Sequence, residues 1–468
     1  MILTSFLGFM LLFVVIGGLS YLQSKKTAED YLVANRSMAP WLVGLSAVAT
    51  NNSGYMFTGM IGFTYSTGLS SIWLMIGWIV GDLAASLSIM KRLRKISEKH
   101  DLHSFGGLLA DWHGEGFNKL RRISGLLILI FLGAYAAAQF NAGSKALHVL
   151  FDWDLKTGAI LGAALVLFYS FMGGIRASIW TDVAQSFVML ISMTVMMVIG
   201  ISHVGGSDIV LSQLHSVNAT YMNWFPDDGW PGIVLFVLGW VFAGFGVAGQ
   251  PHIVVRYIAL DNVNHIGRFR FWYYSWFVTF YAATVVVGLL ARLLLPDVNG
   301  FDAELALPSL ALQILPEALV GLMLAGLFAA TMSTADSLVL SCTASLSRDI
   351  FPDHKAGYWL TKMMTVFVVV SALAIALWGY ESVFQLVLIA WGLLAAAFAP
   401  LLLVYAMGQR PGEAQAITMM FAGIITLLLW RWFGLSEVAY EVMPAMLAGL
   451  LVFVTFQMLG KVQRCDHN

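Results

Sequence analysis

Residues 47–54 read Ala47-Val48-Ala49-Thr50-Asn51-Asn52-Ser53-Gly54 and lie inside an apolar segment long enough to cross a membrane. Thr, Asn, Ser and Gly in succession favour turns over helix, because their short polar side chains compete for backbone hydrogen bonds. In hydrocarbon, an unwound backbone is tolerated only where it faces protein or a watery cavity. The stretch therefore predicts a helix interrupted in mid-membrane, with a small-polar interface between intact helices as the alternative.

The composition describes a polytopic membrane protein. Of the 468 residues, 59% are hydrophobic and only 11% are charged, whereas soluble domains carry about 25% charged residues. The formal net charge of −1 indicates no nucleic acid or other strongly charged partner. Cys342 and Cys465 form neither a disulfide framework nor a metal-binding spacing. We therefore expect an all-α membrane protein and not an enzyme.

Apolar windows of about 20 residues predict the membrane spans. Thirteen such windows cover residues 2–21, 40–64, 70–90, 123–148, 156–174, 180–204, 231–258, 272–295, 317–346, 358–379, 382–408, 413–432 and 439–460. The first is expected to be a retained extra helix, since Lys25 and Lys26 follow it rather than precede it.

The Lys and Arg residues orient these spans. With the N-terminus outside, 21 of the 25 basic residues fall in inside segments, and the exceptions are Lys145, Lys156, Arg292 and Arg431. This bias follows the positive-inside rule and predicts a multi-pass protein with its N-terminus outside and its C-terminus inside.

A second interruption is expected in the span at 231–258. This span contains three glycines and a proline, which disfavour a continuous helix, in Ala243-Gly244-Phe245-Gly246-Val247-Ala248-Gly249-Gln250-Pro251-His252. Counted after the first helix, the breaks fall in spans 1 and 6, and paired breaks in corresponding helices point to a transporter site. We expect a single transmembrane transporter domain over 1–468, with inverted repeats at 40–204 and 231–408 and two peripheral helices within 413–460.

The ninth predicted span carries polar groups deep in the membrane. Ala330, Ser333 and Thr334 share one helix face, because they are spaced i, i+3 and i+4. A carbonyl and two hydroxyls form the oxygen cluster that small hard cations prefer, although such hydroxyls also bond to the preceding turn of their own helix. Asp336 needs a partner, since a charge at the bilayer centre is costly. Asp82 is expected to be a packing acid paired inside the bundle.

Three motifs together resemble the sodium:solute symporter family. They are Trp180-Thr181-Asp182 after two glycines, Gly249-Gln250-Pro251-His252 with Arg256, and Met332-Ser333-Thr334-Ala335-Asp336-Ser337. The resemblance runs over essentially the whole chain, and the nearest branch is the bacterial sodium/proline symporters. It implies an all-α polytopic protein of about thirteen helices with a LeuT-type inverted repeat of five plus five helices, discontinuous helices 1 and 6, and a place in the bacterial cytoplasmic (inner) membrane.

The resemblance also implies the ion sites. By position, the family's main sodium site corresponds to the carbonyls of Ala49, Asn52 and Ala330 and the hydroxyls of Ser333 and Thr334. Some members have a second sodium site, which corresponds here to Asp182, Asp336 and Ser337. Where a member with two sodium ions has a serine, this chain has Asp336.

The two breaks and their neighbours are expected to line the solute site. The expected residues are Thr50, Asn51, Ser53, Gly54, Tyr55, Gln139, Asn141, Ala243, Val247, Gln250 and Trp391. The proline symporters have an aspartate where Asn51 stands, a tryptophan where Tyr55 stands, and aromatic residues where Ala243 and Val247 stand. Losing a carboxylate and two aromatic rings changes the shape of the pocket, so solutes other than proline remain candidates.

The expected function is sodium-coupled import of a small organic solute by alternating access, with an amino acid such as proline as the first candidate. The alternatives are proton coupling through Asp182 or Asp336, a symporter for pantothenate, a monocarboxylate or a sugar, and a transporter-like membrane sensor. The expected partners are the solute, sodium ions and the lipid bilayer. The sequence does not define an oligomeric state.

Overall fold

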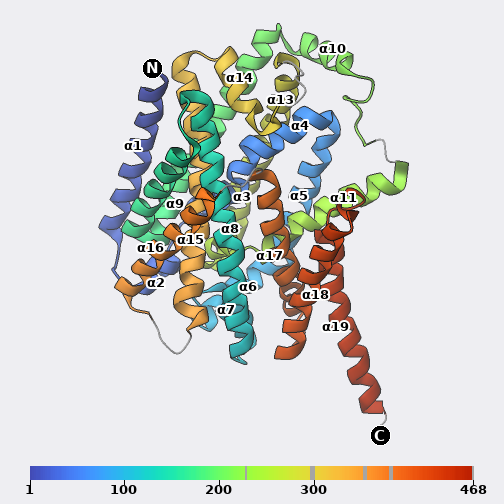
Figure 1. The fold of residues 1–468 in the computed structure, drawn as a ribbon. Coiled ribbons are helices and arrows are strands. Elements are labelled where there is room, and N and C mark those ends of the chain that lie inside the picture. The colour runs from blue at the N-terminus through green and yellow to red at the C-terminus, as the bar shows by residue number, and fades with distance from the viewer. Residues whose placement is uncertain (227–228, 296–300, 352–355, 379–382, 466–468) are drawn as a thin grey trace.

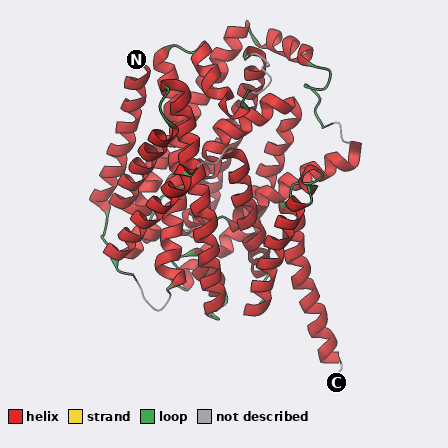
Figure 2. Ribbon diagram, viewed as in Figure 1, coloured by secondary structure: helices red, strands yellow, loops and turns green. Residues whose placement is uncertain are grey.

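A computed structural model describes residues 1–226, 229–295, 301–351, 356–378 and 383–465, and it shows a bundle of helices (Figures 1 and 2). Within these ranges the only β contact is an isolated bridge between Met38 and Leu260. Large apolar side chains such as Leu11 and Phe367 are exposed on the outside of the bundle. An outer surface of this kind suits lipid, where helices satisfy their backbone hydrogen bonds internally.

The first half of the chain forms helices that run along and across the bundle. They are α1 (Ile2–Ser20), α2 (Ala28–Val33), α3 (Pro40–Tyr55), α4 (Ile61–Thr67), α5 (Ile72–Ala85), α6 (Lys91–Lys99), α7 (Phe105–Ala110), α8 (Asn118–Phe151), α9 (Leu155–Val204) and α10 (Ser207–Val217). The second half forms α11 (Gly229–Phe245), α12 (Pro251–Ala259), α13 (Ile266–Leu294), α14 (Ala306–Ile314), α15 (Glu317–Ser345), α16 (Tyr358–Leu377), α17 (Val383–Ala406), α18 (Glu413–Trp432) and α19 (Val442–Cys465).

Eleven helical stretches of the described chain are long and apolar enough to cross a membrane. Two of these, Pro40–Lys99 and Leu155–Val204, have 60 and 50 residues, more than twice the roughly 20 residues that one crossing needs. Each contains a glycine in the left-handed region, Gly68 (φ 80°) and Gly174 (φ 56°). The predicted number of thirteen spans stays a prediction, and residues 379 and 382 at two predicted span ends lie outside the described residues.

Glycine is required at both of these positions by close packing as well as by φ. A Cβ on Gly68 would lie 2.1 Å from the Tyr221 carbonyl oxygen, and a Cβ on Gly174 would lie 2.3 Å from the Tyr31 carbonyl oxygen. Gly174 also coincides with the predicted boundary between the spans at 156–174 and 180–204. The chain therefore changes direction where the sequence predicted one span to end.

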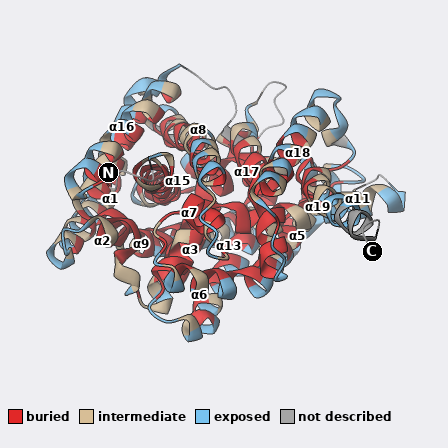
Figure 3. Cartoon of the chain, turned by 90° about the horizontal axis from the view of Figure 1, so that it is seen from below, coloured by how far each residue is buried: buried red, intermediate tan, exposed pale blue. Residues whose placement is uncertain are grey.

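Helix α15 forms the centre of the bundle. Every residue from Met323 to Ser345 is buried, as expected for a helix that is surrounded on all sides. In the view from below, α15 is seen end-on among its neighbours (Figure 3), and it packs against α3, α8, α9, α1 and α16. Helices α18 and α19 pack on each other and on α17 at the edge of the bundle (Figure 1).

Candidate transport site

The first predicted break is confirmed in α3. Ser53 leaves the helical region, with φ 47° and ψ −179°. The amide of Gly54 donates a hydrogen bond to Gln139 Oε1 on α8 at 2.9 Å. A Cβ on Gly54 would lie 2.7 Å from Thr331 Cγ2, so glycine lets the interrupted helix approach α15 closely. The break is thereby held between α8 and α15.

The second predicted break is confirmed between α11 and α12. Gly246–Gly249 form a 3₁₀ turn and Gln250 is extended (φ −101°, ψ 99°). Pro251 then begins α12, a position where its missing amide hydrogen costs nothing. Trp391 of α17 closes the break, because its Nε1 donates to the Ala243 carbonyl at 3.0 Å and its carbonyl accepts from Gln250 Nε2 at 3.0 Å.

Most of the predicted oxygen ligands of the main sodium site lie at one contact between α3 and α15. The Ser333 hydroxyl lies 3.4 Å from the Ala49 carbonyl oxygen and 3.1 Å from the Ala330 carbonyl oxygen. The Thr334 hydroxyl donates to the Thr50 carbonyl at 2.9 Å. All four of Ala49, Thr50, Ser333 and Thr334 have no exposed surface. This contact joins the interrupted helix to the central unbroken one.

Asn52 does not join this contact in the described chain. Its carbonyl accepts a hydrogen bond from the Met56 amide, and its side-chain Nδ2 donates to the Val48 carbonyl at 2.6 Å. The carbonyl next to Thr334 belongs to Thr50, which the sequence suggested for the solute site instead. Only the exact course of the break decides which of these carbonyls faces α15, and its composition does not reveal that course.

A second group of buried polar residues surrounds Arg256 of α12. Its Nη2 lies 3.1 Å from Asp182 Oδ2 on α9, and neither side chain has exposed surface. The Ser46 hydroxyl donates to the same Asp182 oxygen at 2.6 Å and accepts from Arg256 Nε at 3.2 Å. The His252 carbonyl accepts from Arg256 Nη1 at 2.8 Å. The ion pair therefore connects α9, α3 and α12.

Asp336 of α15 completes this group. Its Oδ1 accepts from Ser178 at 3.1 Å and from Ser337 at 2.9 Å, and both hydroxyls also accept from Arg256. One oxygen of each acid, Asp182 Oδ1 and Asp336 Oδ2, has no hydrogen-bond partner in the part of the chain that is described. Two buried carboxyl groups thus surround one guanidinium group, which contacts Asp182 directly and Asp336 only through the two hydroxyls. The predicted residues Asp182, Asp336 and Ser337 do lie together.

Asp82 of α5 is hydrogen-bonded inside the bundle but has no ion pair with a described cation. Its Oδ2 accepts from Asn51 Nδ2 at 3.2 Å and from the Tyr273 hydroxyl at 2.8 Å. Its Oδ1 accepts from the Tyr274 hydroxyl at 2.6 Å. The Asn51 Nδ2 also donates to the Tyr273 hydroxyl. The predicted solute residue Asn51 is therefore linked to α5 and α13.

Helix α5 packs beside both breaks, and the sequence did not predict this position. Its Trp78 ring lies 6.0 Å from the Tyr55 ring and 4.9 Å from the Trp391 ring, centroid to centroid. Trp78 and Asp82 are spaced i, i+4 and face Tyr55 and Asn51, which have the same spacing on α3. This spacing was the only available signal, because no local pattern shows which helix faces which.

Two other predicted solute residues differ in their placement. Val247 lies in the 3₁₀ turn of the second break and is almost fully buried. Asn141 is only half-buried, and no described hydrogen bond joins it to either break. The placement of Asn141 in the solute site therefore stays a prediction.

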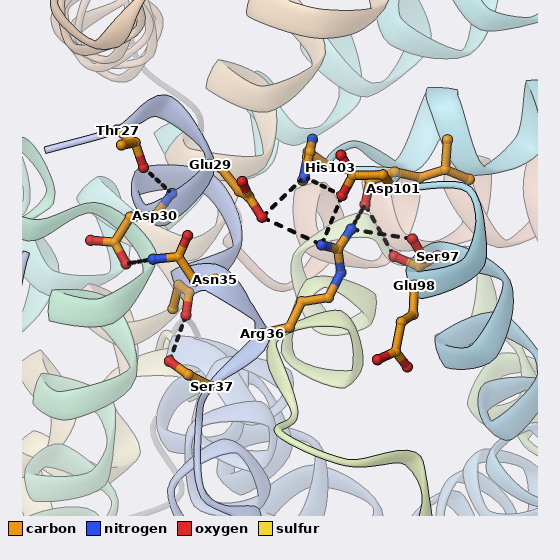
Figure 4. A network of polar contacts seen from close by, with 12 residues as sticks. Thr27, Glu29, Asp30, Asn35, Arg36, Ser37, Ser97, Glu98, Asp101 and His103 are labelled. Atoms are coloured by element: carbon orange, nitrogen blue, oxygen red, sulfur yellow. Dashed lines mark hydrogen bonds and ion pairs between the residues drawn. The ribbon is translucent and has the colours of Figure 1, made fainter. Parts of the chain in front are cut away.

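A polar network lies where α2 meets the end of α6 and the turn that leads to α7 (Figure 4). Arg36 Nη1 lies 3.1 Å from Asp101 Oδ1 and 3.5 Å from Glu29 Oε1, and His103 Nε2 lies 3.1 Å from Asp101 Oδ1. Burial lowers the pKa of His103 below its ordinary value, although Asp101 opposes this shift. Glu29, Asp101 and His103 are close enough to share a metal ion, but Arg36 already forms ion pairs with both acids.

Two interrupted helices that meet beside a central unbroken helix, with buried carboxylates around them, define a secondary transporter. Residues 31–423 match the profile of the Sodium:solute symporter family. The chain belongs to this family. It is a multi-pass membrane transporter that uses sodium as its coupling ion, and it is not an enzyme.

Similar proteins agree with this assignment. The chain is 29% identical over 445 residues to the high-affinity proline transporter PutP of Bacillus subtilis, covering 92% of this chain and 93% of that protein. It is 29% identical over 466 residues to the sodium/proline symporter of Escherichia coli, covering 96% and 91%. The structure of a Na⁺-coupled sialic acid symporter superposes with a TM-score of 0.82 at 19% identity and 96% coverage of both chains. The predicted LeuT-type fold is thereby confirmed.

Proposed function

We propose that this chain imports a small organic solute with sodium and that the solute is an amino acid such as proline. The observation that carries the ion site is the meeting of the Ser333 hydroxyl with the carbonyls of Ala49 and Ala330, at 3.4 and 3.1 Å. Hydroxyl and carbonyl oxygens are the ligands that hard cations take. The choice of proline rests on the relatives from Bacillus subtilis and Escherichia coli, whose names describe proline transport.

The proposed main sodium site lies between the break in α3 and the unbroken α15. Its proposed ligands are the predicted oxygens of Ala49, Asn52, Ala330, Ser333 and Thr334. The Asn52 carbonyl has to turn toward α15 for this, since the Thr50 carbonyl lies beside Thr334 in the structure. An ion bound there holds α3 against α15, and it favours the conformer in which these oxygens converge. An ion shifts a conformational equilibrium only by its difference in affinity for the two states. Sodium binding therefore stabilises the conformer of the break that binds the solute.

The solute is proposed to bind at the polar groups of the two breaks. The Gly54 amide and Gln139 side chain are joined at the first break, and the Gln250 side chain and Trp391 are joined at the second. A solute carboxylate fits the N-terminus of α12, because the helix dipole favours negative charge there. The full proposed set is Thr50, Asn51, Ser53, Gly54, Tyr55, Gln139, Asn141, Ala243, Val247, Gln250 and Trp391.

We also propose a second cation site at Asp182, Asp336 and Ser337. Its support is the imbalance of two buried carboxyl groups against the single guanidinium of Arg256. A second sodium ion neutralises the remaining charge. A proton on one of the two acids has the same effect, and it is the second candidate for this site.

The proposed topology has the N-terminus outside and the C-terminus inside the bacterial cytoplasmic membrane. Its support is the distribution of basic residues and the position of the two termini at opposite ends of the bundle (Figure 1). The proposed organisation is a single domain over 1–468, with an extra helix at 2–21, inverted repeats at 40–204 and 231–408, and two peripheral helices within 413–460.

Uptake of labelled L-proline into proteoliposomes tests this function. A sodium gradient alone should drive accumulation, and a proton gradient without sodium should not. Ser333→Ala combined with Thr334→Ala should abolish the sodium dependence while the protein stays folded. Proton-driven accumulation without sodium, or unchanged sodium dependence in the double variant, would overturn the ion assignment. A wider solute library in a thermal-shift assay with and without sodium identifies the solute if proline is not accumulated.

A further inference from the structure

The network around Asp82 fixes the orientation of the Asn51 side chain. The Asn51 amide nitrogen lies 3.2 Å from Asp82 Oδ2 and donates to it, which matches an ionised carboxylate, since that group only accepts hydrogen bonds. The second amide hydrogen goes to the Tyr273 hydroxyl, which itself donates to Asp82 at 2.8 Å. Both hydrogens of the amide are therefore used, and turning the amide over would place two oxygens against each other.

This orientation leaves the side-chain oxygen of Asn51 free to accept a hydrogen bond. The Asn51 Oδ1 is buried and has no hydrogen-bond partner among the described residues. The atom belongs to the helical part of α3, two residues before the break at Ser53. A buried acceptor without a partner is costly unless a ligand supplies a donor.

The charge behind Asn51 decides which kind of donor fits. Asp82 has no exposed surface, and no Arg, Lys or His in the described ranges forms an ion pair with it. Asn51 Nδ2 and the hydroxyls of Tyr273 and Tyr274 all donate to the Asp82 carboxyl, and such donors favour its ionised form. A negative charge in a region of low dielectric in turn favours a cation nearby. A positively charged N–H group therefore matches Asn51 Oδ1 better than a neutral hydroxyl does.

We propose that Asp82 is a specificity-determining positioning residue, which holds Asn51 so that its Oδ1 accepts a hydrogen bond from a cationic nitrogen of the solute. The proposal rests on the transport function proposed above and deepens it. It defines the solute class as one that carries an ammonium group. Asn51 and Asp82 together then act as one carboxylate, with the acceptor on α3 and the charge on α5.

Infrared spectroscopy tests the orientation without any solute. Protein labelled with ¹³C at the aspartate side-chain carboxyl is compared with its Asp82→Asn variant. The difference spectrum should show loss of an ionised carboxylate stretch. Loss of a carboxylic-acid C=O stretch would overturn the proposal, because a protonated Asp82 can donate to Asn51 Oδ1 and no longer fixes the amide.

Matched solute pairs test the solute class. Thermal shift in saturating sodium compares L-proline with tetrahydrofuran-2-carboxylate, and L-alanine with L-lactate, where each second compound lacks the nitrogen. Only the ammonium member of a pair should stabilise the protein. Stabilisation by the compound that lacks the nitrogen, or by a sugar, would overturn the proposal. Sodium-dependent stabilisation without solute is read in the same assay, so a wrong solute class is distinguished from a wrong sodium site.

Three variants test the role of Asp82 itself. Asp82→Asn should weaken binding of the ammonium solute about 10- to 100-fold, since a charge-assisted interaction is lost. Tyr274→Phe removes a donor to Asp82 that does not touch Asn51, and it should keep the preference for the ammonium member. Asn51→Asp combined with Asp82→Asn should restore binding to within about threefold. If Asp82→Asn and Tyr274→Phe weakened solute binding equally, and the double variant Asn51→Asp/Asp82→Asn did not restore it, the role of Asp82 would be merely structural.

Discussion

Replacing Thr334 by valine should weaken sodium binding with little change in shape. The Thr334 hydroxyl donates to the Thr50 carbonyl at 2.9 Å, across the contact between α15 and α3. Both residues have no exposed surface, so water does not replace the lost donor. The variant keeps a β-branched side chain in the helix and removes the hydroxyl alone.

The size of the effect follows from the buried acceptor. Leaving a buried carbonyl without its side-chain donor costs about 1–3 kcal/mol. If that bond belongs to the conformer that binds sodium, the half-saturating sodium concentration rises about 5- to 150-fold. The assay is a thermal-shift titration with sodium in a background of constant ionic strength, where stabilisation follows mass action.

Thr343 provides the matched control on the same helix. Its hydroxyl is equally buried and donates to Val339 at 2.9 Å and to Thr365 at 3.2 Å, away from α3. Thr343→Val should lower stability without changing the half-saturating sodium concentration by more than about twofold. Equal sodium dependence in the two variants would refute the assignment of the ion to the contact between α3 and α15.

Three other predictions concern packing, the buried charges and pH. Gly81→Ala should lower the melting temperature strongly, because its Cβ would lie 1.9 Å from the Val241 carbonyl oxygen, whereas Gly133→Ala meets nothing within 4 Å and should not. Arg256→Gln should destabilise the protein by about 3–5 kcal/mol in chemical denaturation, because it leaves buried carboxylates without their cation; an unchanged midpoint would contradict the ion pair. Burial lowers the pKa of His103 in the folded protein, so on acidification the unfolded state binds a proton first and stability should fall as pH drops below about 6.5. In His103→Gln, the melting temperature should therefore change less between pH 5 and pH 7.

The sequence predicted the breaks well because their cause is local. Ser53 and Gly54 follow two asparagines, and Gln250 follows three closely spaced glycines, so composition alone disfavours a helix there. The spacing of Ala330, Ser333 and Thr334 likewise follows from helix geometry. These features need no knowledge of the remaining chain.

Contacts between distant residues could not be predicted in the same way. Asn51 and Tyr273 are 222 positions apart, and no spacing rule connects them. The choice between Thr50 and Asn52 as the carbonyl beside Thr334 depends on the direction of each peptide group within the break. Asp82 was expected to be a packing acid paired inside the bundle, and its hydrogen bond to Asn51 comes only from tertiary packing.

The balance of buried charge leads to a prediction about coupling. In the described spans around the breaks, Asp82, Asp182 and Asp336 are fully buried. Arg256 forms an ion pair with Asp182 and is linked to Asp336 through two serine hydroxyls, whereas no described cation pairs with Asp82. Three ionised acids and one guanidinium leave two negative charges, each costing at least ~2.5 kcal/mol at the bilayer centre. A zwitterionic solute adds no net charge, so neutrality of the loaded state requires two cations for each solute. Reversal-potential measurements in proteoliposomes should therefore give two charges per proline. A value of one charge per proline would mean that one acid keeps its proton throughout the cycle. If Asp336→Asn also gave one charge per proline, the proton would be assigned to Asp336.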